Sequence, residues 1–289
     1  MEATMPTPEN GASGESAQQP TTPQVPEFED VLYEVEDTFA VITMNRPKAF
    51  NAFRAQTIDE LIEAFTFAWG DARVRSIILT GSGEKAFCAG GDVKQKAETG
   101  DYGPSRYGMF RVSELHKLIR DVPKPVIAAV NGVAVGGGHV LHVVCDISYA
   151  AEHARFGQAG PKVGSFDAGF GTAFLARVVG EKRAREIWYF TELMDAQKAE
   201  SWGLVNAVVP GEELLDYAKE RARLLGQQAP TALRFLKQSF NADSDHQAGF
   251  TSLAMSALDL YQHSPESHEG AAAFAEKRAA DFTPYVNGF

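Results

Sequence analysis

Apolar and polar residues alternate over residues 31–44, and a period of two is typical of a half-buried strand. The alternation breaks at Asp37 and Thr38, so this stretch predicts a β-hairpin with its turn there. Residues 57–69 and 112–119 carry apolar side chains at helical spacing, which predicts amphipathic helices. Short, continuously apolar runs predict buried strands at 76–80, 126–130 and 147–150. Strands that alternate with loops and helices in this way indicate an α/β fold.

From residue 180 onward the pattern becomes almost wholly helical. Predicted helices cover residues 182–190, 196–202, 214–225, 231–240, 249–261 and 269–278, with a short strand at 205–209. We therefore expect a core over residues 27–200 and a helical C-terminal region over residues 201–289. Residues 93–108 predict a mobile loop. Residues 1–26 contain no Lys or Arg and almost no large apolar residue, so they predict a disordered tail.

Composition narrows the classes of function. The 289 residues are 44% apolar and 22% charged, which is ordinary for a globular protein, and the net charge of −11 argues against binding nucleic acid or an anionic membrane surface. No apolar run reaches the ~18 residues that suggest a membrane span. Cys88 and Cys145 imply neither a disulfide framework nor a cysteine-based zinc site, and they favour a reducing, cytoplasmic setting. His139 and His142 lie three residues apart without a third ligand, so no metal is expected.

Two glycine-rich loops follow predicted strands. Gly136–Gly138 open a segment of helical length, and a second loop ends at Gly91. Glycine lets a ligand approach the backbone closely, and the first amides of a helix have no intrahelical acceptor. The amides of Gly91 and Gly137 could therefore bind an oxygen that becomes negatively charged during a reaction. Taken alone, the glycine triplet is better explained by close packing of a helix on a strand.

Five motifs resemble those of the crotonase (enoyl-CoA hydratase/isomerase) superfamily over residues 28 to about 280. They are Asn45–Pro47, Ala86–Asp92, Lys124–Ala128, Gly136–Gly138 with Cys145–Asp146, and Phe156–Gln158. The resemblance implies a spiral of ββα units with a helical C-terminal trimerisation region, and a homotrimer or homohexamer. It also implies acyl-CoA thioester substrates, no tightly bound cofactor, and Gly91 and Gly137 as the oxyanion donors. By the same resemblance, the residues that bind substrate or coenzyme A are Lys48, Ala89, Gly90, Asp92, Lys94, Tyr107, Val133, Gly136, Ala159 and Tyr261.

The resemblance also shows a departure from the hydratases. Their two catalytic glutamates correspond here to Val140 and Gly160, so an ordinary hydratase is not expected. Ser165 and Asp167 stand in a glycine-rich turn that resembles two other branches, 2-ketocyclohexanecarboxyl-CoA hydrolase and 1,4-dihydroxy-2-naphthoyl-CoA synthase. The first opens a β-keto ring and the second closes one, and both use a thioester enolate. An alternative for Asp167 is that it only caps the helix that follows.

Several motifs favour the ring-opening branch, among them Phe28–Asp30, Leu115–His116 and Gly171–Arg177. In the synthase branch a bound bicarbonate acts as base. Gln158, Gly160 and Trp188 match that pocket, although Ala159 replaces a threonine, so either bicarbonate or Asp167 is a candidate base. Ser165 or a tyrosine would return the proton to the α-carbon. A non-catalytic CoA-binding or scaffold protein is the alternative of another class, and the presence of Ser165, Asp167 and both glycine loops argues against it.

Overall fold

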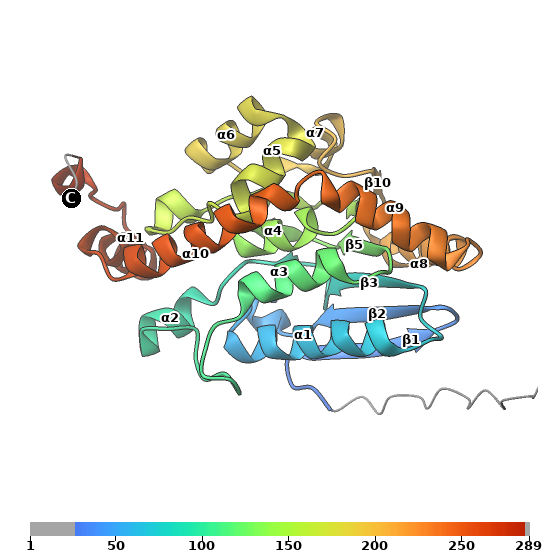
Figure 1. The fold of residues 1–289 in the computed structure, drawn as a ribbon. Coiled ribbons are helices and arrows are strands. Elements are labelled where there is room, and N and C mark those ends of the chain that lie inside the picture. Colours follow the sequence, from blue (N-terminus) through green and yellow to red (C-terminus); the bar gives the residue numbers. More distant parts are fainter. Residues whose placement is uncertain (1–26, 287–289) are drawn as a thin grey trace, which may run out of the picture.

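The computed structural model describes residues 27–286, and for residues 97–99 and 248–250 it describes the backbone alone. The tail predicted over residues 1–26 lies outside the described residues. Figure 1 shows strands in the interior, with helices wrapped around them. Within the described residues, no helix combines the length and apolar character needed to cross a membrane.

The larger sheet has six strands in the order β1, β2, β3, β5, β7 and β10. Their bounds are Val31–Glu36, Phe39–Met44, Ser76–Gly81, Val126–Val130, Ile147–Ala151 and Ala207–Val209. The predicted hairpin is confirmed, because β1 and β2 pair antiparallel with Glu36 opposite Phe39, and Asp37 in the turn has a φ of 49°. The other neighbours in this sheet pair in parallel, so each pair needs a crossover connection.

A smaller sheet joins four short strands in the order β4, β6, β8 and β9. They span Ala86–Cys88, Val133–Val135, Arg155–Gly157 and Met194–Asp195. β3, β5 and β7 of the larger sheet are each followed in the chain by one strand of the smaller sheet and then by a helical segment. This repeated order is the ββα spiral that the resemblance implied. The short strands were not predicted, because two or three residues are too few to show a period.

The helices are α1 (Ala55–Gly70), α2 (Val93–Thr99), α3 (Val112–Asp121), α4 (Gly137–Val143), α5 (Leu175–Val179), α6 (Glu181–Phe190), α7 (Ala196–Ser201), α8 (Leu214–Gly226), α9 (Pro230–Ala242), α10 (Ala248–Gln262) and α11 (Pro265–Ala275). α8 packs on β2, β3, β5 and β7. In Figure 1 the C-terminal helices, in orange and red, follow one another along one side, and α11 contacts α2. The prediction of a loop over residues 93–108 is wrong in its first part, which forms α2. The last helix also begins and ends earlier than predicted.

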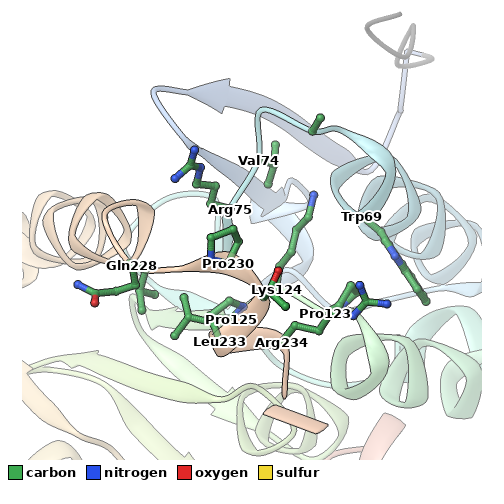
Figure 2. A pocket seen from close by; sticks show the side chains of 13 residues that line it. Trp69, Val74, Arg75, Pro123, Lys124, Pro125, Gln228, Pro230, Leu233 and Arg234 are labelled. Atoms are coloured by element: carbon green, nitrogen blue, oxygen red, sulfur yellow. The ribbon is translucent and has the colours of Figure 1, made fainter. Parts of the chain in front are cut away.

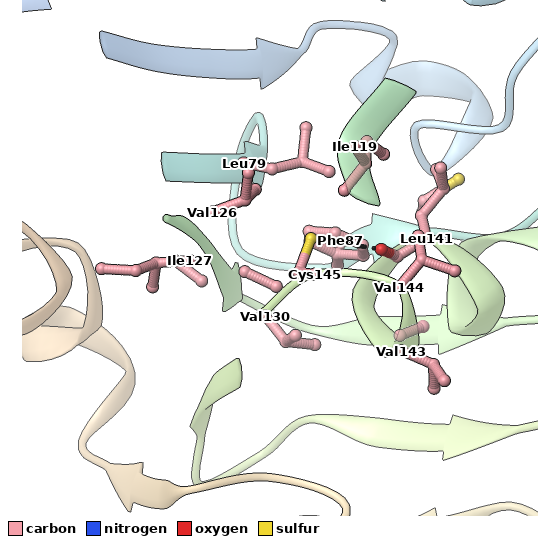
Figure 3. Close-up of a cluster of buried hydrophobic side chains, with 14 of the residues drawn as sticks. Leu79, Phe87, Ile119, Val126, Ile127, Val130, Leu141, Val143, Val144 and Cys145 are labelled. Carbon is pink, nitrogen blue, oxygen red and sulfur yellow. Dashed lines mark hydrogen bonds between the residues drawn. The ribbon is translucent and has the colours of Figure 1, made fainter. Parts of the chain in front are cut away.

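Part of the hydrophobic core lies where β5 packs against α3 and α4. β5 is buried at all five positions, as expected for a strand covered on both faces. Figure 3 shows Val126, Ile127 and Val130 of this strand in one buried cluster with Ile119 of α3 and Leu141 of α4. This packing holds the start of α4, and therefore the glycine triplet, in a fixed position beside the smaller sheet.

Candidate functional site

The site forms where three parallel strands of the smaller sheet end side by side. β4 pairs with β6, and β6 pairs with β8. The loop after β4 carries Gly90 and Gly91, the loop after β6 carries Gly136 and Gly137, and the loop after β8 carries Gln158 to Gly160. Because the carboxyl ends of neighbouring parallel strands meet at one edge, the topology brings these three loops together.

The two glycine loops touch backbone to backbone. A Cβ added to Gly90, whose φ is +89°, would lie 3.1 Å from the amide nitrogen of Gly137. Phe53 donates its N–H to the Gly90 carbonyl at 2.8 Å and accepts from Asp92 N at 2.9 Å, a pattern that leaves the Gly91 amide free. Gly137 is the first residue of α4, so its amide has no intrahelical acceptor. Two unused N–H donors therefore lie close together in the described structure.

Gly91 and Gly137 both line a pocket of about 380 Å³. Its walls are largely apolar, with aromatic side chains from Phe53, Phe110 and Phe274. The ionisable side chains among its lining residues are Lys96, Tyr102, His116 and Asp167. Among the described lining residues Asp167 is thus the single carboxylate, on a pocket wall that also includes Ser165.

Asp167 both caps a helical turn and lines the pocket. Its Oδ1 accepts from the amides of Gly169 and Gly171 at 3.1 and 3.2 Å, at the start of the π-helical turn η3 (Phe170–Phe174). Among the described residues no group donates to its other oxygen. The two alternatives for this residue therefore do not exclude each other, because one oxygen fixes the turn and the second remains available in the pocket.

The residues expected to hold bicarbonate do not fit that ion. Gln158, Gly160 and Trp188 do line the pocket, but the indole Nε1 of Trp188 already donates to the Gly171 carbonyl at 2.6 Å. Ala159 has no hydroxyl to donate. The side-chain amide of Gln158 lies 3.3 Å from Nδ1 of His139. The indole donor of Trp188 is therefore occupied and the threonine hydroxyl is absent, so the reaction proposed for this pocket does not use bicarbonate.

The structure gathers most of the sequence-predicted residues at this pocket. Those that line it are Ala89, Gly90, Gly91, Val133, Gly136, Gly137, Gln158, Ala159, Gly160, Ser165, Asp167 and Trp188. Five others do not line it: Lys48, Asp92, Lys94, Tyr107 and Tyr261. Asp92 instead caps α2 and pairs with Arg46 at 2.9 Å, and Tyr107 is 53% exposed. Tyr261 stands behind Phe166, a lining residue, with ring centroids 5.4 Å apart.

Tyr102 and His116 also line the pocket, although neither is among the site residues predicted from the sequence. Tyr102 stacks on Phe110 with centroids 4.5 Å apart, and a Cβ added to Gly91 would come within 2.5 Å of its ring. Burial raises the pKa of Tyr102, so its hydroxyl keeps a proton. Burial also lowers the pKa of Lys96, whose Nζ lies 5.7 Å from the Tyr102 ring centroid. Two features of the sequence pointed to His116: it belongs to the Leu115–His116 motif, and it is a polar residue on the apolar face of the helix predicted at 112–119.

The cysteines and the His139–His142 pair lie in the interior. Burial raises the pKa of Cys88 to about 12 and lowers that of His139 to about 3, so neither is ionised near neutral pH. Such a thiol is a poor nucleophile. In the part of the chain that the structure describes, no group of three or more His, Cys, Asp or Glu side chains could hold a metal ion.

A second pocket, of about 320 Å³, shares no lining residue with the first (Figure 2). It lies between Trp69 of α1 and Pro230 of α9. Its lysine, Lys124, donates to the carbonyls of Ala68 and Asp71 at 2.6 and 2.8 Å, and burial lowers its pKa to about 8. This lysine holds the end of α1, and the pocket has no glycine amides, so the first pocket is the candidate active site.

Comparisons with known proteins establish the family of the chain. A family model described as enoyl-CoA hydratase/isomerase matches residues 34–284. A carnitinyl-CoA hydratase from Mycobacterium avium is 29% identical, with a TM-score of 0.80 over 89% of this chain and 99% of that chain. An enoyl-CoA hydratase/isomerase from Xanthobacter autotrophicus Py2 is 31% identical, with a TM-score of 0.75 over 86% and 94%. An enoyl-CoA hydratase from Bacillus anthracis is 32% identical, with a TM-score of 0.69 over 88% and 98%. The chain therefore belongs to the enoyl-CoA hydratase/isomerase family of the crotonase superfamily.

Proposed function

We propose that this acyl-CoA enzyme opens the ring of a cyclic β-ketoacyl-CoA by hydrolysis of a C–C bond, in the manner of a 2-ketocyclohexanecarboxyl-CoA hydrolase. The observation that carries the proposal is one pocket whose described lining combines two free glycine amides with a single carboxylate. Amide donors of this kind stabilise a thioester enolate, and Asp167 lies in the same pocket to act on water or on the ketone end of the ring.

Hydration of a double bond, the activity in the names of several similar proteins, finds less support here. The resemblance places the hydratase glutamates at Val140 and Gly160. Val140 is fully buried and does not line the pocket. A Cβ at Gly160 would lie 2.7 Å from the Ser165 carbonyl oxygen and 3.0 Å from the Trp188 ring, so this position has no room for a carboxylate side chain. The lining residues that the structure describes therefore include no pair of carboxylates that could add water across a double bond.

The proposed reaction begins with the thioester oxygen bound to the amides of Gly91 and Gly137. Water attacks the ring ketone carbon and gives up a proton to a base on the pocket wall that includes Asp167. The bond between the ketone carbon and the α-carbon breaks, and its electron pair passes to the thioester enolate. Ser165 or Tyr102 relays a proton to the α-carbon, and the product is a dicarboxylic acid esterified to CoA at one end. Tyr102 replaces Tyr107 and Tyr261 as the tyrosine considered, because it alone of the three lines the pocket.

Ring closure by a 1,4-dihydroxy-2-naphthoyl-CoA synthase-like reaction is the competing proposal. Lys96 supports it, since a cation in the pocket could pair with a substrate carboxylate. The apolar wall formed by Phe53, Phe110 and Phe274 supports an uncharged ring instead. We therefore favour ring opening.

Incubation with three thioesters separates these reactions. We expect 2-oxocyclohexanecarboxyl-CoA to gain the mass of one water, and succinylbenzoyl-CoA and crotonyl-CoA to remain unchanged. Loss of one water from succinylbenzoyl-CoA would support the synthase, and gain of one water by crotonyl-CoA would support a hydratase. A scaffold protein would turn over none of them, and calorimetric titration with CoA thioesters would show whether it binds any.

We also propose that the enzyme assembles as a homotrimer or homohexamer. Large apolar side chains stay exposed in the single chain on α9 and α10, among them Phe240 at 77% and Leu260 at 77%. Burying such side chains against another copy is the ordinary way to remove them from water. A mass of 31.4 kDa by light scattering, the mass of one chain, would contradict this expectation.

A further inference from the structure

His116 combines burial with access to the pocket. It lies on the apolar face of α3 beside Leu115 and Ile119, and it is 2% exposed. It nevertheless lines the pocket that holds Asp167, and its ring meets Phe170 edge-on at 5.6 Å. Buried polar atoms normally have hydrogen-bond partners. Among the described residues none is found for Nε2 of His116.

His139 and His142 also leave Nε2 without a partner among the described residues, and His116 differs from them in its Nδ1 and in its place on the pocket wall. His142 places Nδ1 3.2 Å from the Ser148 hydroxyl, and His139 places Nδ1 3.3 Å from the Gln158 amide. Neither of these rings lines the pocket. His116 has no such bond to another described residue, and its ring stands at the pocket wall. The ring at the pocket wall therefore has hydrogen-bonding capacity that no described residue uses.

The electrostatic surroundings suit a general base. Burial lowers the pKa of His116, and the carboxylate of Asp167 opposes that shift, so the ring is neutral near neutral pH. The other ionisable side chains on the pocket wall are Lys96 and Tyr102, and Arg120 lies against the Phe170 ring at 5.8 Å. A neutral imidazole can accept a proton, and the cation formed would be stabilised by the nearby carboxylate. Asp167 need not move, since two backbone amides already hold its Oδ1.

We infer that His116 is the general base of the ring-opening step and that Asp167 is the carboxylate that stabilises its imidazolium; this inference rests on the proposed function. The imidazole takes one proton from the attacking water while the water oxygen bonds to the ketone carbon. When the bond to the α-carbon breaks, its electron pair passes to the enolate on Gly91 and Gly137. The proton then returns to the α-carbon through the Ser165 or Tyr102 hydroxyl. One water is consumed, and no electrons are gained or lost overall.

The kinetic test compares His116→Gln with His246→Gln, which alters an exposed histidine outside the pocket. We expect kcat for 2-oxocyclohexanecarboxyl-CoA to fall by about 10²–10⁴-fold in His116→Gln with KM little changed, and to stay at the wild-type value in His246→Gln. The acid limb of the kcat/KM profile against pH, where His116 becomes protonated, should disappear in His116→Gln. Circular dichroism and thermal melting give the folded fraction used to correct the rates. A folded His116→Gln enzyme with wild-type kcat, or with the acid limb intact, would overturn the inference.

A second measurement needs no substrate. NMR titration of the imidazole Cε1–H resonances should give a lower pKa for His116 in Asp167→Asn than in the wild type, because the charge that raises this pKa has been removed. A wild-type protein that fails to open the ring refutes the proposed function. An active wild type whose His116 pKa is the same in Asp167→Asn refutes the pair while leaving the proposed function in place.

Discussion

The indole Nε1 of Trp188 donates a hydrogen bond of 2.6 Å to the carbonyl oxygen of Gly171. This bond ties α6 to the turn that Asp167 caps, and it uses the only polar group of the tryptophan. Because Ala159 also lacks a donor, we expect ring-opening turnover to be independent of bicarbonate. Initial rates in carbon dioxide-free buffer should equal those after bicarbonate is added. A saturable rise in rate with added bicarbonate would show that the ion is bound and used.

Asp167→Asn should separate the structural role of this side chain from its chemical role. The amide oxygen of asparagine can still accept from Gly169 and Gly171, so the turn should persist and the melting temperature should change little. Without the carboxylate, turnover should fall by about 10²–10⁴-fold. Melting curves measure the structural role and ring-opening rates measure the chemical role, both on the same samples. Undiminished turnover would remove Asp167 from the reaction.

Gly137→Ala tests the oxyanion site. An added Cβ would collide with the ring of Phe53, so either the ring or the amide must shift. We expect kcat to fall by about 10²–10³-fold, as for loss of one oxyanion donor. Gly70→Ala is the matched control, because a Cβ there meets nothing within 4 Å and lies at the end of α1. Equal activity in the two variants would contradict the assignment of the Gly137 amide.

Asp30 should make stability depend on acid pH. Burial acts to raise the pKa of Asp30, but hydrogen bonds from Arg54 and Thr57 outweigh it and hold that pKa below its usual value. A carboxyl group whose pKa is lowered by folding stabilises the protein above its unfolded pKa, and this contribution is lost as the pH falls through the folded pKa. Asp30→Asn should therefore lower the free energy of unfolding at pH 7 and flatten its decline below about pH 4.

Urea denaturation over a pH series measures this effect. Asp37→Asn serves as the control, because Asp37 pairs with Arg223 at 2.7 Å on the surface, where its side chain is 55% exposed. Exposed pairs contribute about 0–1 kcal/mol, so the control should behave almost as the wild type. If both variants show the same acid slope as the wild type, the Asp30 network is not a source of acid sensitivity.

The elements with a clear period were predicted from the sequence, and the elements that shape the pocket were not. β5 is apolar at every position and α1 has a regular apolar face, so both were predicted within two residues. β4, β6 and β8 have only three residues each, too few for any periodic signal. Their parallel pairing is what brings the three loops of the site together, and pairing depends on contacts between distant residues.

In the candidate site, too, some residues were predicted from the sequence and others were not. Gly91, Gly137 and Asp167 belong to local motifs, and all three line the pocket. Tyr102 and Tyr107 lie in the same stretch of chain, and no local pattern distinguishes them. Tyr102 faces the pocket because its carbonyl accepts from Ala55 N at 2.8 Å and its ring stacks on Phe110. These are tertiary contacts, which a single sequence does not reveal.

Oxygen-18 water tests the proposed reaction most directly. After incubation of the wild-type enzyme with 2-oxocyclohexanecarboxyl-CoA in labelled water, tandem mass spectrometry locates the label in the product. Ring opening by water predicts one labelled oxygen in the new free carboxyl group, at the end remote from the intact thioester. Label only in an acid released together with free CoA would show thioester hydrolysis instead. That result, or an unlabelled and unchanged substrate, would contradict C–C bond hydrolysis by this protein.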